Sequence, residues 1–224
     1  MPRTSVFVLA AAAAAATCAL AACGPVRMGA AAISGGDRIT ATTLSDQVSS
    51  LERAAKASRS IQLQFPQSEA PQEVLSWLLR FQIRDELAAR NHIVVTTGES
   101  QRALSLLARQ TGRSGAGFLQ LAVANGLAPD MLPDLGRYEA IQTDMFTRLN
   151  GGTLPRTQAR VQALSPEFSR RECNAAKSLN IQVNPQYGQL DYRTYSVVPA
   201  PSTLSAPATP APSRTPKPQL TPAC

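Results

Sequence analysis

Histidine is nearly absent from this chain, since His92 is the only one in 224 residues. A zinc site needs three or four ligands, and a nucleophilic triad needs a nucleophile beside its imidazole. Asn91 and an Ile-Val-Val run flank His92, so we expect a surface or helix-capping residue. Asp85 and Glu86 are adjacent on a helical stretch and point in different directions, which argues against a catalytic carboxylate pair. The sequence therefore predicts no catalytic residue, no metal, no cofactor and no small-molecule substrate.

Aromatic residues are also scarce, at 5% of the chain. The net charge is +7, and the sequence contains no long run of charged residues of one sign. Nucleic-acid binding favours a concentrated basic stripe with aromatic side chains on which bases stack. The composition therefore argues against nucleic acid as a partner. A dispersed positive charge suits a protein that lies close to anionic lipid, although most such charge is simply solvated.

The chain lacks a long run of strongly apolar residues, but its first segment is apolar and nearly uncharged. Arg3 is followed by an alanine-rich run from Val6 to Ala22. A helix that spans a membrane needs about 20 residues, most of them more strongly apolar than alanine. Residues 1–22 therefore have the features of a secretory signal peptide rather than an uncleaved anchor. The segment ends in Leu20-Ala21-Ala22-Cys23, which resembles a bacterial lipobox.

A lipobox implies that the thiol of Cys23 carries the lipid, with palmitate as a typical acyl chain. Residues 23–31 would then be a lipidated tether, and the protein would lie on the extracytoplasmic face of the cell membrane. An ordinary signal peptide with an incidental cysteine is the alternative. If Cys23 is acylated, Cys173 and Cys224 form the only possible pair in the processed chain. We expect any such bridge to be incidental, and Cys173 to be a partly buried apolar residue on a helix.

The spacing of apolar residues between the two ends is mostly helical. A hairpin is expected first, with a Gly35-Gly36 turn and a second strand that ends at Thr40, a good helix N-cap. Apolar residues at intervals of three and four then predict helices. These span residues 41–58, 71–90, 98–110 with Thr97 as N-cap, 118–125, 130–149, 157–164, and a last helix that begins at Ser165-Pro166. We expect a solvated edge on the helix 71–90, formed by Arg80, Arg84, Asp85, Glu86 and Arg90.

The carboxyl-terminal segment is rich in proline. Residues 199–224 contain eight prolines and seven Ser or Thr, with Arg214 and Lys217 as their only charges. Such a segment has too few apolar residues to offset the entropy of ordering. We therefore expect a Pro/Ser/Thr-rich disordered tail, which we place at residues 192–224.

The order of these features resembles the SurA N-terminal domain family of extracytoplasmic chaperones, which is similar to PrsA-type foldases. The opening matches the family's small apolar strand, Gly-rich turn, Ile-Thr pair and helix through Ala32, Ile33, Gly35, Gly36, Ile39, Thr40 and Leu44. The closing strand matches through Val183, Asn184, Pro185, Tyr187 and Gly188. The resemblance implies a mainly α-helical domain over residues 32–191. It also implies a small β element, formed by segments near both ends of the chain, in which the closing strand lies beside the opening one.

One part of the family pattern is missing. SurA and PrsA proteins usually carry parvulin-type prolyl isomerase domains before the closing helix, and residues 150–165 leave no room for one. The parvulin site also uses paired histidines, whereas His92 stands alone. The resemblance therefore does not imply isomerase activity for this chain.

An apolar binding surface remains as the basis for a function. The helix 71–90 has an apolar set wider than one stripe, which is typical of a central helix. Adaptable apolar side chains on it and on its neighbours can bind extended chains without any catalytic residue. The candidate peptide-binding residues are Trp77, Phe81, Phe118, Met131, Met145 and Phe146, although each one taken singly is more often an ordinary core residue.

The sequence thus predicts a membrane-anchored, non-catalytic chaperone that holds unfolded or partly folded exported polypeptides. Two alternatives stay open. One is a foldase related to the peptidyl-prolyl isomerases, and the other is a structural or adaptor lipoprotein that binds its partner through the Pro-rich tail.

Overall fold

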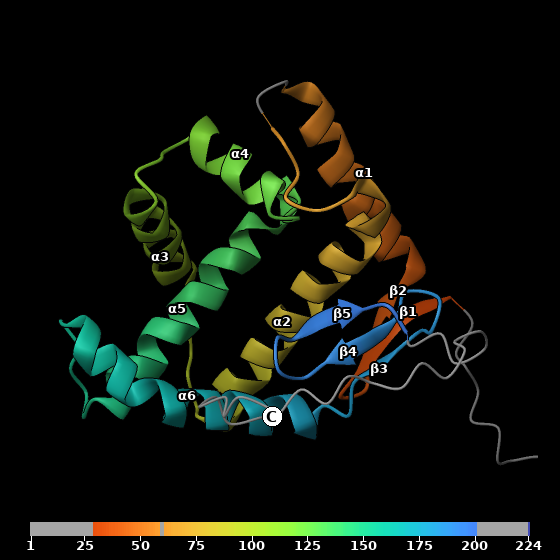
Figure 1. Cartoon of the computed structure of the whole chain (residues 1–224). Helices are drawn as coiled ribbons and strands as arrows, with labels where there is room; N and C mark the ends of the chain where they lie inside the picture. Colours follow the sequence, from red (N-terminus) through yellow and green to blue (C-terminus); the bar gives the residue numbers. More distant parts are fainter. Residues whose placement is uncertain (1–28, 59–60, 201–223) are drawn as a thin grey trace, which may run out of the picture.

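The computed structural model describes residues 29–58, 61–200 and 224 and shows a mainly helical protein with two small antiparallel sheets (Figure 1). The predicted signal peptide, Cys23 and most of the Pro-rich tail lie outside the described residues. The helices are α1 (Ala41–Ala57), α2 (Ala70–Arg90), α3 (Thr97–Gln110), α4 (Ala116–Ala124), α5 (Leu132–Leu149) and α6 (Gln158–Ser178), with short 3-10 turns at Gln67–Glu69 and Pro129–Met131. The strands are β1 (Ala30–Ser34), β2 (Asp37–Thr40), β3 (Gln182–Val183), β4 (Gln189–Asp191) and β5 (Ser196–Val198).

Side-chain caps define where the first helices begin. The hydroxyl of Thr40 accepts a hydrogen bond from the backbone N–H of Thr43 at 2.9 Å, as the sequence predicted for α1. The N-cap of α3 is Thr96 and not Thr97, because Thr96 and Glu99 form a capping box. The Glu99 carboxylate accepts the Thr96 backbone N–H at 2.8 Å, and Thr96 accepts the backbone N–H of Glu99 in return. Thr97 cannot take that role, since the acidic residue must lie three positions after the cap.

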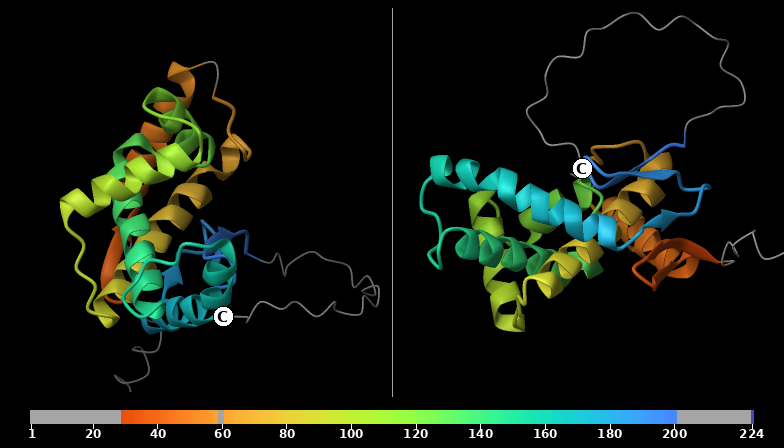
Figure 2. Two further views of the ribbon diagram at one scale, coloured as in Figure 1. Left: turned by 90° about the vertical axis from the view of Figure 1, so that its left-hand side faces the viewer. Right: turned by 90° about the horizontal axis from the view of Figure 1, so that it is seen from below.

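The two helices predicted around Ser165 are one continuous helix, α6. Thr157 caps it by accepting the backbone N–H of Arg160, and Pro166 lies in its interior. The Ser165 hydroxyl donates back to the carbonyl of Val161 at 2.9 Å instead of capping a new helix. A proline removes one backbone donor and weakens a helix locally, but the turns on both sides of it continue. Figure 2 shows α6 running across α2 and α5, with which it is in contact.

The larger sheet joins the two ends of the folded chain, with strand order β2-β1-β3. Ala32 pairs with Val183, so the closing strand lies beside the opening one, as the family resemblance implied. The backbone N–H of Asn184 also donates to the carbonyl of Ala31 at 2.9 Å. Ala30 and Ala31 are buried in β1, so the tether predicted at residues 23–31 extends too far and must end before Ala30.

The hairpin of β4 and β5 packs on α2 and extends the fold past its predicted boundary (Figure 1). Val197 is buried, and its backbone N–H donates to the hydroxyl of Ser76 at 2.8 Å. The guanidinium of Arg80 donates to the carbonyl of Tyr195 and to the hydroxyl of Ser196. A tail beginning at residue 192 is therefore wrong, because β5 is part of the packed structure through Val198.

Cys173 is a partly buried residue on α6, as expected. It is not a free thiol, because it forms a disulfide with Cys224, with 5.4 Å between their α-carbons. The Pro-rich segment thus begins at β5, on the surface of α2, and ends covalently on α6.

Candidate binding groove between α3 and α5

Exposed apolar side chains gather beside α3 and α5. In the described part of the chain, Val94, Leu106 and Leu154 are large apolar residues that are 85%, 49% and 53% exposed. Val94 precedes α3, Leu106 lies on α3, and Leu154 lies in the connection from α5 to α6. Large apolar side chains grouped on a surface are a mark of interaction sites, and these three line two adjoining hollows.

The first hollow measures about 380 Å³ and lies between α3 and α5 beside the residues that precede α3. Its lining consists of Val94, Val95, Glu99, Arg102, Ala103, Leu106, Ala140, Thr143, Asp144, Thr147 and Arg148. Acidic and basic groups are equally represented in it, and Arg148 is paired with Asp144 at 3.0 Å. The hollow therefore offers apolar contacts framed by balanced charge.

The second hollow measures about 280 Å³ and shares Ala103, Leu106 and Thr143 with the first. Its lining is completed by Leu107, Gln110, Glu139, Gln142, Phe146, Leu154, Pro155 and Val161. Leu106 thus stands between the two hollows. We refer to the first and second hollows together as the α3–α5 groove.

The position of α3 explains why the groove is open. All residues of α3 are described, and none of them is fully buried. Its contacts are mainly with α5, and Leu104, Leu107 and Ala108 are only partly buried against the core. An amphipathic helix that packs on a single neighbour leaves the edges of its apolar face accessible. The groove follows those edges.

Among the residues that line the second hollow, Glu139 is the one with an acidic or basic side chain. The structure shows no hydrogen bond and no ion pair from any described residue to its carboxylate. Burial raises the pKa of Glu139, and the nearby Arg84 guanidinium opposes that rise. The carboxylate is therefore partly desolvated without a partner, which is an energetically unfavourable arrangement.

A buried ion pair lies behind the groove. The side chain of Arg84 is only 2% exposed and contacts the Glu172 carboxylate at 2.7 Å. The same guanidinium donates to the hydroxyl of Tyr138 at 2.7 Å and to the amide oxygen of Gln142 at 3.0 Å. It also lies over the rings of Tyr138 and Phe168. Arg84 therefore does not belong to the solvated edge predicted for α2, because α5 and α6 cover it.

Two tyrosines beside this ion pair are stabilised in their neutral form. Burial raises the pKa of the Tyr138 phenol, and the Arg84 guanidinium opposes the rise. Burial likewise raises the pKa of Tyr195, assisted by the negative charge of Glu172. Neither phenol is poised to act as a base near neutral pH, so the cluster joins α2, α5 and α6 structurally.

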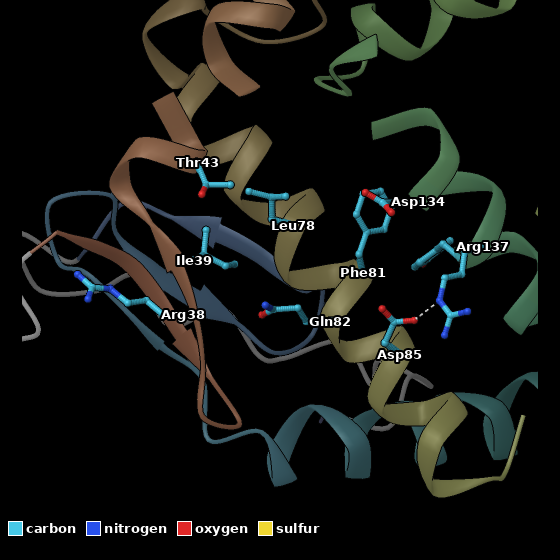
Figure 3. Close-up of a pocket in the computed structure, with 10 residues that line it drawn as sticks. Arg38, Ile39, Thr43, Leu78, Phe81, Gln82, Asp85, Asp134 and Arg137 are labelled. Carbon is cyan, nitrogen blue, oxygen red and sulfur yellow. Dashed lines mark hydrogen bonds and ion pairs between the residues drawn. The ribbon is translucent and has the colours of Figure 1, made fainter. Parts of the chain in front are cut away.

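A separate hollow of about 280 Å³ lies between β2, α1, α2 and α5 (Figure 3). Leu78 and Phe81 contribute apolar surface, and the Arg137 guanidinium donates to the Asp85 carboxylate at 2.7 Å. Figure 3 shows Arg38 pointing away from this pair. Asp85 and Arg137 already neutralise each other by linking α2 to α5, and this hollow therefore offers less to a ligand than the α3–α5 groove.

The structure does not gather the six predicted peptide-binding residues into one surface. Phe81, Phe118, Met131 and Met145 are core residues, exposed by 8% or less. Trp77 is partly buried, and its indole N–H donates to the carbonyl of Asn125 at 2.9 Å. Phe146 alone lines the groove, where it also stacks on Phe168 with 4.8 Å between the rings. The surface predicted from the other five is corrected accordingly, because the helices bury or cover them.

Sequence reasoning missed Val94, Leu106, Leu154 and Glu139. A signal for Leu106 was present, since Leu104, Leu107 and Ala108 already form the inward stripe of α3 and Leu106 falls outside it. His92 is exposed with φ 52° directly after α2, and its backbone N–H bonds to the carbonyl of Ala89. It therefore closes the end of α2, as predicted for a capping residue.

Residues 29–58, 61–200 and 224 contain no group of three or more His, Cys, Asp or Glu placed to hold a metal ion. Within the same ranges, no helix has the length and hydropathy that crossing a membrane requires. Comparison with protein-family models found no match, and comparisons with curated proteins and with solved structures found none either.

Proposed function

We propose that this protein is a non-catalytic chaperone that holds unfolded or partly folded exported polypeptides in the α3–α5 groove. The observation that carries the proposal is the grouping of Val94, Leu106 and Leu154, all exposed, around two adjoining hollows. Unfolded chains expose short apolar segments. Two hollows separated by one leucine suit such a segment, because successive side chains can enter on either side of Leu106.

The location in this proposal is the extracytoplasmic face of the cell membrane, with lipid on Cys23 as the anchor. The sequence around Cys23 and the disulfide between Cys173 and Cys224 support it, since disulfides persist mainly in oxidising compartments. Intact-mass analysis of the native protein tests the anchor. A chain that begins at Cys23 and carries the added mass of acyl groups is expected, and an unmodified leader contradicts it.

A SurA-like fold is the finer structural part of the proposal. The pairing of β1 with β3 and the start of α1 at Thr40 support it. The resemblance suggests a holding activity without prolyl isomerisation.

The experiment is an aggregation-suppression assay on the full chain, in a non-ionic detergent at a concentration that leaves client aggregation unchanged. Leu106→Ser combined with Leu154→Ser should abolish most of the suppression, because it removes exposed apolar area from the second hollow. The control is Leu106→Met with Leu154→Met, which keeps the surface apolar and adaptable. The free energy of unfolding of both double variants should lie within about 0.5 kcal/mol of the wild-type value, since the substituted side chains are exposed.

Equal suppression by the serine and methionine pairs would contradict a role for the groove. Absence of suppression by the wild type against several unrelated clients would contradict the chaperone proposal itself. The disulfide favours a second candidate, an adaptor that binds its partner through the Pro-rich segment, because both ends of that segment are held on the fold. Deleting residues 199–224 should leave a groove-based chaperone active, whereas an adaptor of this kind loses its partner.

A further inference from the structure

Glu139 is placed where a ligand, rather than the protein, would have to neutralise it. Glu139 lines the second hollow together with Leu107, Phe146 and Val161. The backbone carbonyl of Glu139 accepts a hydrogen bond from the hydroxyl of Thr143. Within the described residues, the carboxylate itself has no donor and no cation in contact.

Arg84, the cation whose charge acts on Glu139, is already engaged. Arg84 forms its ion pair with Glu172, and it donates further hydrogen bonds to Tyr138 and Gln142. Its charge acts on Glu139 from a distance, where it opposes the rise in pKa that burial causes. A second cation in the hollow would therefore complete a contact that the fold leaves open.

The shape and lining of the hollow limit what that cation can be. Its volume of about 280 Å³ lies just below the range of roughly 300–1,000 Å³ typical of small-molecule sites, which suits one long side chain. The apolar walls match an aliphatic stem, and lysine and arginine bury such stems while their charged ends find a polar partner. An acidic side chain would meet the like charge of Glu139, and an apolar one would bury the carboxylate without compensation.

We propose that the second hollow of the α3–α5 groove binds the side chain of a lysine or arginine in the client, with Glu139 as its ion-pair partner. This inference rests on the proposed chaperone function and adds a sequence preference to it. Clients would be held by an apolar residue in the first hollow and a basic residue in the second, on the two sides of Leu106. Exported segments that combine apolar and basic residues are the substrate class that follows.

The test measures binding of short fluorescein-labelled peptides to the full chain by fluorescence anisotropy. The peptides are identical except for one central position, which is lysine, the uncharged analogue norleucine, or glutamate. Wild-type protein should bind the lysine peptide about tenfold more tightly than the norleucine peptide, which corresponds to about 1.4 kcal/mol. The glutamate peptide should bind more weakly than both.

Glu139→Gln keeps the shape of the side chain and removes its charge. It should bring the affinities for the lysine and norleucine peptides within about twofold of each other, because it weakens lysine binding and also removes the penalty that norleucine meets when it buries a carboxylate. The matched control is Glu69→Gln, which makes the same substitution at an exposed residue before α2 and gives the same net charge. That variant should keep the lysine preference, so long-range electrostatics and the local contact are separated.

Two results overturn the inference while leaving the chaperone proposal standing. One is equal binding of the lysine and norleucine peptides by wild type, and the other is a lysine preference that survives Glu139→Gln. Absence of binding for every peptide would overturn the chaperone proposal together with this preference.

Discussion

The carbonyl oxygen of Ser100 on α3 lies so close to Gly136 on α5 that a β-carbon at residue 136 would stand 2.6 Å from it. Real β-carbons do not approach a backbone oxygen to that distance, so only glycine fits there. The contact brings the backbones of the two helices together beside the first hollow. Gly136 therefore determines how closely α3 lies on α5.

Gly136→Ala should push α3 away from α5 and lower the free energy of unfolding by about 1–3 kcal/mol, the usual cost of overpacking. Urea denaturation followed by circular dichroism measures this. Gly98→Ala is the matched control on α3, where an added β-carbon has no neighbour closer than 3.9 Å. That substitution should be neutral or stabilising by about 0.5–1 kcal/mol, since it favours the helix. Equal effects of the two substitutions would contradict the close contact.

Glu172→Gln should destabilise the fold by about 3 kcal/mol, because it leaves the Arg84 charge buried without a counter-ion. The pair Lys56–Glu52 on α1 supplies the comparison, since the Lys56 side chain is 72% exposed. Lys56→Gln should cost less than about 0.5 kcal/mol, as is usual for surface pairs. Chemical denaturation of both variants measures the difference, and similar costs would mean that the Arg84 site is hydrated.

Glu139→Gln should stabilise the fold at neutral pH by up to about 1 kcal/mol. Burial raises the pKa of Glu139 in the folded state, so the folded protein gains stability from the protonated form. That gain is fully present below the unfolded-state pKa of about 4.3 and is lost as pH rises through the higher folded-state value. Glutamine imitates the protonated form at every pH.

Denaturation of wild type and Glu139→Gln at pH 7.5 and at pH 4 checks this sign. The stability advantage of the variant should be present at pH 7.5 and should shrink toward zero at pH 4. Glu69→Gln, at an exposed position, should stay within about 0.5 kcal/mol of wild type at both. A variant that is less stable than wild type at pH 7.5 would show that the carboxylate has a stabilising partner.

Cys173→Ser should cost only about 0.6 kcal/mol of stability, although a bridge across 51 residues is expected to contribute about 4 kcal/mol. The sequence predicts no packed structure for the Pro-rich segment, so the folded protein must close a loop from Val198 to Cys224. The bridge closes a loop about twice as long in the unfolded chain, and a doubling of loop length changes the free energy of closure by only about 0.6 kcal/mol. Most of the entropic cost of closure is therefore the same in the folded and unfolded states and cancels. Thermal unfolding with the bridge intact and absent measures it, and a loss of several kcal/mol would show that the segment is ordered.

Much of the fold could be predicted from the sequence because apolar spacing and caps act locally. The start of α1 at Thr40 was predicted correctly from its cap. The pairing of the opening and closing strands is a long-range contact, and it was expected only from the family resemblance. The split of α6 at Pro166 was wrong, since a proline signal was given more weight than the helical turns on both sides of it. The sequence named Cys173 and Cys224 as the only possible pair but gave no reason to expect a bridge, because their separation of 51 residues hides that Cys224 returns to α6.

The groove was harder to predict than the helices, because exposure depends on which faces meet. A wide apolar set on α2 indicates a central helix, and the residues on it become core once α5 and α6 cover it, as Phe81 shows. Leu106 is exposed because α3 packs mainly on α5. Whether a charged residue such as Glu139 or Arg84 finds a partner is decided by tertiary contacts that no local pattern encodes.

The disulfide on α6 also changes what a single break in the backbone would do. A protease that cleaves once between Val198 and Cys224 opens the chain, but the released end stays attached through the sulfur bridge to Cys173. No fragment leaves the molecule until a reductant acts or a second cleavage follows. Such nicked protein would migrate as two pieces only on a reducing gel, and its helical body would remain whole.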